Sequence, residues 1–105
     1  MYVLSWDSVK SATNAVQRGF DFTHAARVFA GFTLEYEDNR RDYGERRISA
    51  IGRVDGVDLT VIYTDRVVGA VHERRIISAR RSSRRERERY AQSLQDNADP
   101  RPRPS

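Results

Sequence analysis

The side chains with the clearest chemical potential in this 105-residue chain are arginines gathered between residues 74 and 90. The segment has a net charge of +6, whereas the whole chain has a formal net charge of +4. Its arginines are Arg74, Arg75, Arg80, Arg81, Arg84, Arg85, Arg87 and Arg89. Because a guanidinium stays charged and donates paired hydrogen bonds to phosphate oxygens, we expect one continuous cationic surface that binds phosphate. The alternative is a solvated helix in which Glu86 and Glu88 pair with neighbouring arginines.

Other kinds of site have little support in the sequence. The chain has no cysteine, which excludes disulfides, thiolate metal ligands and a thiol nucleophile. His24 and His72 have no partner at the spacing of a ligand pair, so we expect neither a metal site nor a cofactor. The six glycines are scattered singly, and neither a nucleophile elbow nor a phosphate-binding loop can be drawn.

Period-two alternation predicts the strands that carry these arginines. Strands are expected near residues 32–36, over Arg46–Val54, over Val57–Thr64 and over Val71–Ala79. Asp55-Gly56 is a hairpin signal, Asp65–Ala70 is a second turn, and Glu37–Glu45 is a loop. In the last strand, regular alternation places Arg75, Ile77 and Ala79 on the face opposite Arg74, Ile76 and Ser78.

Three helices are expected from capping residues and helical spacing. Asp7, the apolar residues Val9, Ala12 and Val16, and Gly19 predict a helix over residues 8–18. Thr23 can cap a second helix over His24–Ala30. Ser83 and Glu86 have the spacing of a capping box for a third helix over Arg84–Leu94.

The resulting fold class is α+β, with two N-terminal helices, a four-stranded antiparallel sheet and a C-terminal helix. We expect a single domain over residues 1–94 and a disordered tail over residues 95–105, which contains three prolines and little apolar content. Without a basic leader or a run of about 20 apolar residues, the protein is expected to be soluble and cytoplasmic, with no membrane contact.

Over residues 4–90 the sequence resembles the BrnT-type ribonuclease toxins of bacterial type II toxin–antitoxin systems. The resemblance rests on Trp6-Asp7, Lys10, Asn14, Phe22, Ala25-Ala26, Val28-Phe29, Glu45-Arg46, Ile51-Gly52, Arg75–Arg81, Arg84, Glu86 and Tyr90. It implies a RelE-like fold, cleavage of RNA that inhibits translation, and neutralisation by a BrnA-type antitoxin in a toxin–antitoxin hetero-oligomer. The DNA-binding domain of that antitoxin would also repress the operon.

The sequence departs from the family at one position of chemical interest. Where the family usually has Lys-His-Gly after the first helix, this chain has Gln17-Arg18-Gly19. If that histidine is catalytic in the family, this copy lacks it. The alternative to an active ribonuclease is therefore a decayed toxin that binds RNA or sequesters the antitoxin without cleaving.

Metal-free RNA cleavage needs a base for the 2′-hydroxyl, cations for the phosphorane and an acid for the departing 5′-oxygen. We expect Arg75 and Arg80 to stabilise the phosphorane. Glu45 is the candidate base, although a salt-bridged structural glutamate is as good an interpretation. Tyr90 is the candidate acid or stacking residue, with simple packing as the alternative.

The remaining candidates are positive side chains that would contact RNA rather than take part in proton transfer. They are Lys10, Arg53, Arg81, Arg84 and Arg85. Trp6 could stack on a base, but we expect it to be a core anchor beneath the first helix.

Overall fold

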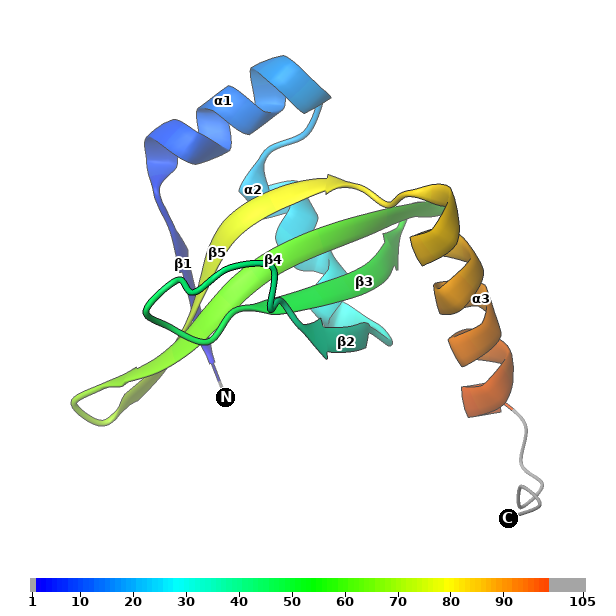
Figure 1. Cartoon of the computed structure of the whole chain (residues 1–105). Coiled ribbons are helices and arrows are strands. Elements are labelled where there is room, and N and C mark those ends of the chain that lie inside the picture. The colour runs from blue at the N-terminus through cyan, green and yellow to red at the C-terminus, as the bar shows by residue number, and fades with distance from the viewer. Residues whose placement is uncertain (1, 99–105) are drawn as a thin grey trace, which may run out of the picture.

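The computed structural model describes residues 2–98, which form a mixed five-stranded sheet with helices on both faces (Figure 1). The elements in chain order are β1 (Val3–Trp6), α1 (Ser8–Arg18), α2 (Phe22–Ala25), the 3-10 helix η1 (Ala26–Ala30), β2 (Leu34–Glu37), β3 (Ile48–Val54), β4 (Val57–Val68), β5 (Val71–Arg81) and α3 (Arg84–Ala98). The strand order is β1-β5-β4-β3-β2. The α+β class is confirmed.

The prediction of a purely antiparallel four-stranded sheet is wrong because β1 forms a fifth strand. β1 pairs in parallel with β5, from Val3 opposite Glu73 to Trp6 opposite Ile76. A parallel pair cannot be joined by a tight turn, and here α1 and most of the sheet lie between the two strands in the chain. Trp6 is half-buried and packs against the core, as expected of an anchor.

The two hairpins differ in how well local signals predict them. Asp55 and Gly56 both have positive φ, 50° and 79°, which confirms the tight turn between β3 and β4. The second turn is shorter than the predicted Asp65–Ala70, because β4 continues to Val68 and β5 begins at Val71. Ion pairs across the two strands, Arg66 with Glu73 and Asp65 with Arg74, stabilise this extension.

Some of the predicted helix ends are correct and others are wrong. Asp7 accepts hydrogen bonds from the backbone N–H groups of Val9 and Lys10, which confirms the cap of α1. Asp21, rather than the predicted Thr23, caps α2, so the second helical segment starts at Phe22 and continues as η1. Helix α3 ends at Ala98 rather than Leu94, so residues 95–98 are helical and not part of a tail. Residues 99–105 lie outside the described part of the chain.

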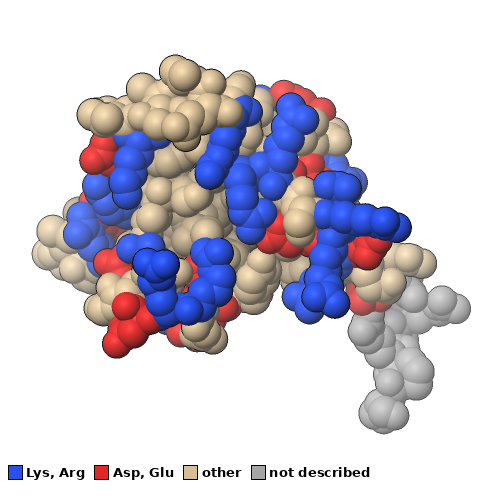
Figure 2. Space-filling model, turned by 45° about the horizontal axis from the view of Figure 1, so that its top comes forward, with Lys and Arg blue, Asp and Glu red and all other residues tan. Residues whose placement is uncertain are grey.

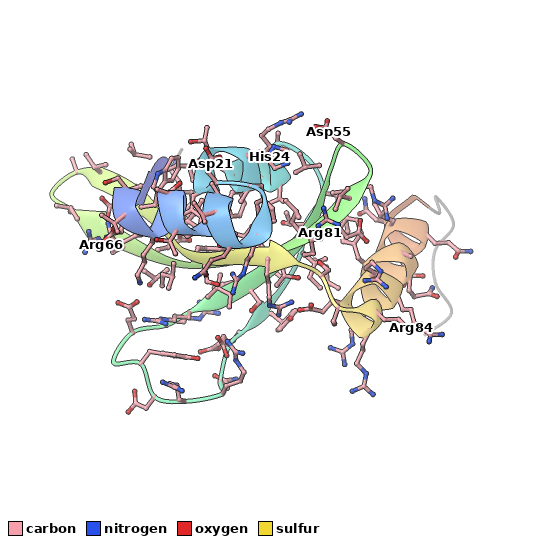
Figure 3. The ribbon with its side chains drawn as sticks, turned by 90° about the horizontal axis from the view of Figure 1, so that it is seen from above. Asp21, His24, Asp55, Arg66, Arg81 and Arg84 are labelled. Atoms are coloured by element: carbon pink, nitrogen blue, oxygen red, sulfur yellow. The ribbon has the colours of Figure 1, made fainter. Side chains whose placement is uncertain are left out.

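The two faces of the sheet have different coverings. On one face, α2 and η1 bury the core, which consists of Phe22, Ala25, Val28, Val54, Leu59, Val61, Ile76 and Ala79. On the other face, the loop of residues 38–47 and helix α3 lie at opposite sides (Figure 3). We call this second face the concave face. Among residues 2–98, no helix is long and apolar enough to cross a membrane.

Close packing of β3 against η1 makes Gly52 sensitive to substitution. An added Cβ would lie 2.6 Å from Cβ of Val28, so η1 would have to move. We expect Gly52→Ala to lower the free energy of unfolding by about 1–3 kcal/mol in urea titrations. Gly31→Ala is the control, because a Cβ there meets nothing within 4 Å and its φ is −124°. Equal unfolding midpoints for the two variants would contradict this packing.

Candidate functional site

The placement of Arg75 and Arg80 depends on an irregularity in β5. Residues five apart in a regular strand point to opposite faces of the sheet. Here Arg75 is opposite Thr64 and Arg80 is opposite Thr60, and the register shifts between Ile62 and Tyr63. Because Thr60 and Thr64 of β4 share a face, Arg75 and Arg80 also share one.

The extra residue in β5 is Ile77, since Ile76 is paired with Tyr63 and Ser78 with Ile62. The predicted alternation is therefore wrong from Ile77 onward, and Ala79 lies in the core with Ile76. Bulges of this kind re-aim side chains and are common next to active sites. In this chain the bulge places both arginines, together with Ser78, on the concave face.

A hollow of about 150 Å³ lies on the concave face beside Arg80. It is lined by Tyr36, Glu37, Asp38, Asn39, Arg40, Ser49 and Arg80. Arg40 is held by Asp38 through two side-chain hydrogen bonds of 2.9 Å. The hollow therefore combines cationic groups from β5 and the 38–47 loop with a phenol from β2.

Glu86 is the hydrogen-bonding centre of this region. Its carboxylate accepts two bonds from the Arg80 guanidinium, at 2.6 and 3.0 Å. It also accepts one from the Tyr36 hydroxyl at 2.9 Å and one from the backbone N–H of Ser83 at 2.8 Å. The backbone N–H of Glu86 donates to Ser83 Oγ, which confirms the predicted capping box.

These contacts determine the protonation states of Glu86 and Tyr36. Burial raises the pKa of Glu86, but the hydrogen bonds from Arg80, Ser83 and Tyr36 outweigh it and lower that pKa to about 2. Burial, followed by the bond to Glu86, raises the pKa of Tyr36. The side chain of Arg80 remains 36% exposed beside the hollow. At neutral pH the site thus holds a carboxylate, a protonated phenol and a partly accessible guanidinium.

Arg75 differs from Arg80 in having no ion pair within the described residues. Arg75 and Lys10 both act on Asp7: backbone hydrogen bonds chiefly, and then the positive charges of Lys10 and Arg75, lower the pKa of that carboxyl. Figure 2 shows basic side chains around a hollowed, uncharged area bounded by α1, the 38–47 loop and α3. This rim of cations could hold a phosphate without displacing an internal partner at Arg75.

The expectation of one continuous cationic surface is wrong, because neighbouring arginines on β5 point to opposite faces. Arg74 projects away from the concave face, pairs with Asp65 at 2.8 Å and lies over the Tyr63 and Phe29 rings. Arg81 lines a separate hollow of about 570 Å³ beside the first turns of α3. That hollow also contains Arg53, Asp58, Arg84, Arg87 and Glu88, and Arg81 and Arg84 are labelled in Figure 3.

Several of these arginines are already engaged. Arg53 pairs with Asp58 at 2.7 Å, and Arg84 pairs with Glu88 at 3.1 Å. The interpretation of local pairing is therefore correct for Arg84, and Arg85 is exposed on α3 outside both hollows.

The two predicted proton-transfer residues lie outside the small hollow. Tyr90 is 3% exposed, and its hydroxyl donates to the backbone oxygen of Phe32 at 2.8 Å. The packed interpretation thus describes Tyr90, whose buried hydroxyl is directed at a backbone oxygen. Glu45 lies in the 38–47 loop and pairs with Arg47 at 3.4 Å, which matches the salt-bridged alternative.

Sequence reasoning missed Tyr36 as a functional candidate and saw Glu86 only as a cap. The alternation of residues 32–36 did place Tyr36 on a strand, but no local pattern joins it to a carboxylate fifty positions away. Arg18, at the position of the family histidine, donates to the backbone oxygen of Ala79 at 2.7 Å and to Asn14 at 3.3 Å. It therefore has a structural role on α1.

A family model described as the ribonuclease toxin BrnT of type II toxin–antitoxin systems matches residues 6–86. The chain belongs to this family. The family is one of ribonuclease toxins, which suggests ribonuclease activity, and a type II system implies an antitoxin partner. A search of curated proteins found no match. Within residues 2–98, no three His, Cys, Asp or Glu side chains group as metal ligands.

The Glu86 contacts predict a specific dependence of stability on pH. Because the pKa of Glu86 falls from 4.5 to about 2 on folding, its contribution is complete above about pH 4.5 and is lost as the pH falls toward 2. We expect Glu86→Gln to lower the free energy of unfolding by about 2 kcal/mol at pH 7, because Arg80 loses its partner. The wild-type and variant values should converge between pH 5 and 2.

The matched control is Glu88→Gln, which removes the exposed partner of Arg84. We expect a change of less than about 0.5 kcal/mol at every pH, measured by urea unfolding. A gap between wild type and Glu86→Gln that stays constant down to pH 2 would show that this carboxylate does not provide the acid sensitivity.

Proposed function

We propose that this toxin is a metal-independent endoribonuclease that cleaves RNA on the concave face, inhibits translation in the cytoplasm and is neutralised by a BrnA-type antitoxin. The observation that carries the proposal is the bulge in β5, which brings Arg75 to the same face as Arg80, whose guanidinium binds Glu86 beside Tyr36. Two guanidiniums next to a phenol match the requirements for stabilising and completing a phosphoryl transfer.

In the proposed reaction, the 2′-oxygen attacks the adjacent phosphorus while its proton passes to Glu45, on the loop that borders the concave face (Figure 3). Arg75 and Arg80 stabilise the negative charge of the phosphorane. The bond from phosphorus to the 5′-oxygen then breaks, and that oxygen takes the proton of Tyr36. The products are a 2′,3′-cyclic phosphate and a 5′-hydroxyl, and no co-reactant is needed.

Tyr36 is protonated at neutral pH, because burial and the bond to Glu86 raise its pKa, and its hydroxyl has to turn from Glu86 to the departing 5′-oxygen to give up its proton. Glu86 accepts its hydrogen bond and orients it, while Arg80 holds Glu86 in place. Tyr36 thus replaces Tyr90 as the proposed acid.

The other cations are proposed to guide the RNA strand. Lys10 on α1, whose charge acts with that of Arg75 on Asp7, would extend the cationic rim. Arg53, Arg81 and Arg84 in the larger hollow, with Arg85 on the same helix, would contact phosphates farther along the strand. These contacts should be sensitive to salt.

A non-catalytic module is the second candidate function, because Arg18 occupies the family histidine position and donates hydrogen bonds to Asn14 and to the backbone oxygen of Ala79. Induced expression separates the two functions. Growth arrest supports the ribonuclease, whereas salt-sensitive RNA binding without arrest supports the module.

Arg75→Ala is the sharpest test of the proposed phosphate site, because Arg75 forms no ion pair within residues 2–98 whose loss would disturb folding. We expect cleavage of RNA in EDTA to fall at least 100-fold, with the unfolding midpoint unchanged. Arg80→Ala is less informative, because it also leaves the buried carboxylate of Glu86 without its ion-pair partner.

Arg27→Ala is the control, because Arg27 lies on η1 across the sheet and pairs with exposed Asp55. Its cleavage rate should equal that of the wild type. A requirement for magnesium, or full activity in Arg75→Ala, would refute the proposed mechanism.

Tyr36→Phe tests the proposed acid while retaining the Arg80–Glu86 ion pair. We expect the rate constant of cleavage to fall about 100-fold on normal RNA. RNA with sulfur in place of the departing 5′-oxygen should be cleaved equally by variant and wild type, because a thiolate leaves without a proton. Tyr43→Phe, on the 38–47 loop, should cleave both substrates normally. Equal losses on both substrates would mean that Tyr36 acts through structure alone.

A further inference from the structure

Helix α1 is inverted relative to an ordinary surface helix. Its buried residues are polar, Ser11 and Asn14, whereas Val9 is 72% exposed and Val16 is 87% exposed. Val9, Ala12 and Val16 have the spacing that predicts a core-facing stripe, yet all three are exposed.

Hydrogen bonds explain why the polar side of α1 faces inward. Ser11 Oγ accepts from the backbone N–H of Phe22 at 2.9 Å, and Asn14 donates to the backbone oxygen of Phe20 at 2.8 Å. Arg18 donates to the backbone oxygen of Ala79 at 2.7 Å. These bonds attach α1 to the following loop and to β5, and they leave the apolar stripe without a partner in residues 2–98.

The outward stripe forms a shallow groove that carries no charged side chain. The groove has a volume of about 440 Å³ and is lined by Ser8, Val9, Ala12, Thr13, Val16 and Gln17. Figure 2 shows α1 as an uncharged surface at the top of the molecule, above the basic rim. Contiguous apolar surface of this kind, with a polar border, is typical of protein interaction sites.

The charges beside the groove favour one kind of occupant. Helix α1 contains Lys10 and Arg18 and has no acidic residue between Ser8 and Arg18. A second copy of the chain would add the same two positive charges, and a helix of 11 residues is only about 16 Å long. That length offers much less than the roughly 800 Å² per partner of a standard interface, so self-association through this face alone is disfavoured.

We propose that the outer face of α1 docks an amphipathic helix of the antitoxin, with acidic residues beside its apolar stripe. The identity of this partner rests on the proposed function, whereas the surface and the chemistry of the docking helix follow from α1. A helix that binds in a groove usually contacts it through apolar side chains at positions i, i+3 and i+7, and we expect this spacing in the docking helix. The acidic residues would face Lys10 and Arg18.

Continuity with the concave face explains how docking would inhibit cleavage. Val9, Thr13 and Gln17 line both the groove and a neighbouring cavity of about 200 Å³, which also contains Lys10, Arg18 and Ser78. Lys10 in turn acts with Arg75 on the Asp7 carboxylate. A helix on α1 thus places its acidic side chains beside the phosphate-binding rim and leads the following chain toward it.

The experiment compares the full-length double variant Val9→Glu/Val16→Glu with Val67→Glu/Val68→Glu, which changes two similarly exposed valines at the β4–β5 turn. The probe is the purified antitoxin encoded beside the toxin gene, titrated by calorimetry. Glutamate favours helix at least as well as valine, so α1 should fold normally. We expect the α1 variant to bind at least 100-fold more weakly and the control variant to bind like wild type.

Ribonuclease activity of each free variant is measured in parallel and should be unchanged. If the wild-type toxin has no ribonuclease activity but the antitoxin binds it and not the α1 variant, the proposed function is refuted and the docking surface is supported. Wild-type affinity in the α1 variant would overturn the docking proposal. The docking proposal would also be overturned if the free wild-type toxin formed dimers, or sedimented with anionic vesicles, and the Val9→Glu/Val16→Glu variant did not.

Discussion

The carboxylate of Glu86 accepts hydrogen bonds from three separate parts of the chain: Arg80 near the end of β5, Tyr36 on β2, and the backbone before α3. These bonds fix α3 against the concave face and satisfy the first turn of the helix. They also assign the charges, because a carboxylate with four donors stays ionised and keeps Tyr36 protonated. The same interaction therefore attaches the last helix and orients the candidate acid, which links stability to chemistry at one residue.

The bulge at Ile77 is the second constraint, and it acts on geometry rather than on charge. Without it, Arg75 and Arg80 would lie on opposite faces of β5, and one of the two would point into the core beside Ile76. An extra residue in the strand costs regular pairing at one position. In return, Arg75 and the glutamate-bound Arg80 share one surface of the sheet.

Local signals predicted the elements whose causes are local. The turn at Asp55-Gly56, the limits of α1 and the capping box at Ser83 all depend on residues within a few positions of one another, and all are confirmed. Strand β1, the bulge and the Tyr36–Glu86 contact depend on partners distant in the chain, so alternation and capping rules could not show them. The predicted continuous surface of arginines was wrong for the same reason, because the net charge of a segment does not show on which face of the sheet each side chain lies.

The inversion of α1 shows that an apolar pattern can predict a helix without predicting which side of it faces the core. Helical spacing of Val9, Ala12 and Val16 correctly predicts a helix, but amphipathicity has two solutions, and the buried hydrogen-bonding needs of the loop decide between them. Buried backbone groups at Phe20 and Phe22 require partners, and Asn14 and Ser11 supply them only if the polar side of α1 faces inward. The cost is an exposed apolar stripe on a small domain. That cost is removed when another helix covers the stripe, so a partner that covers α1 also stabilises the fold it binds.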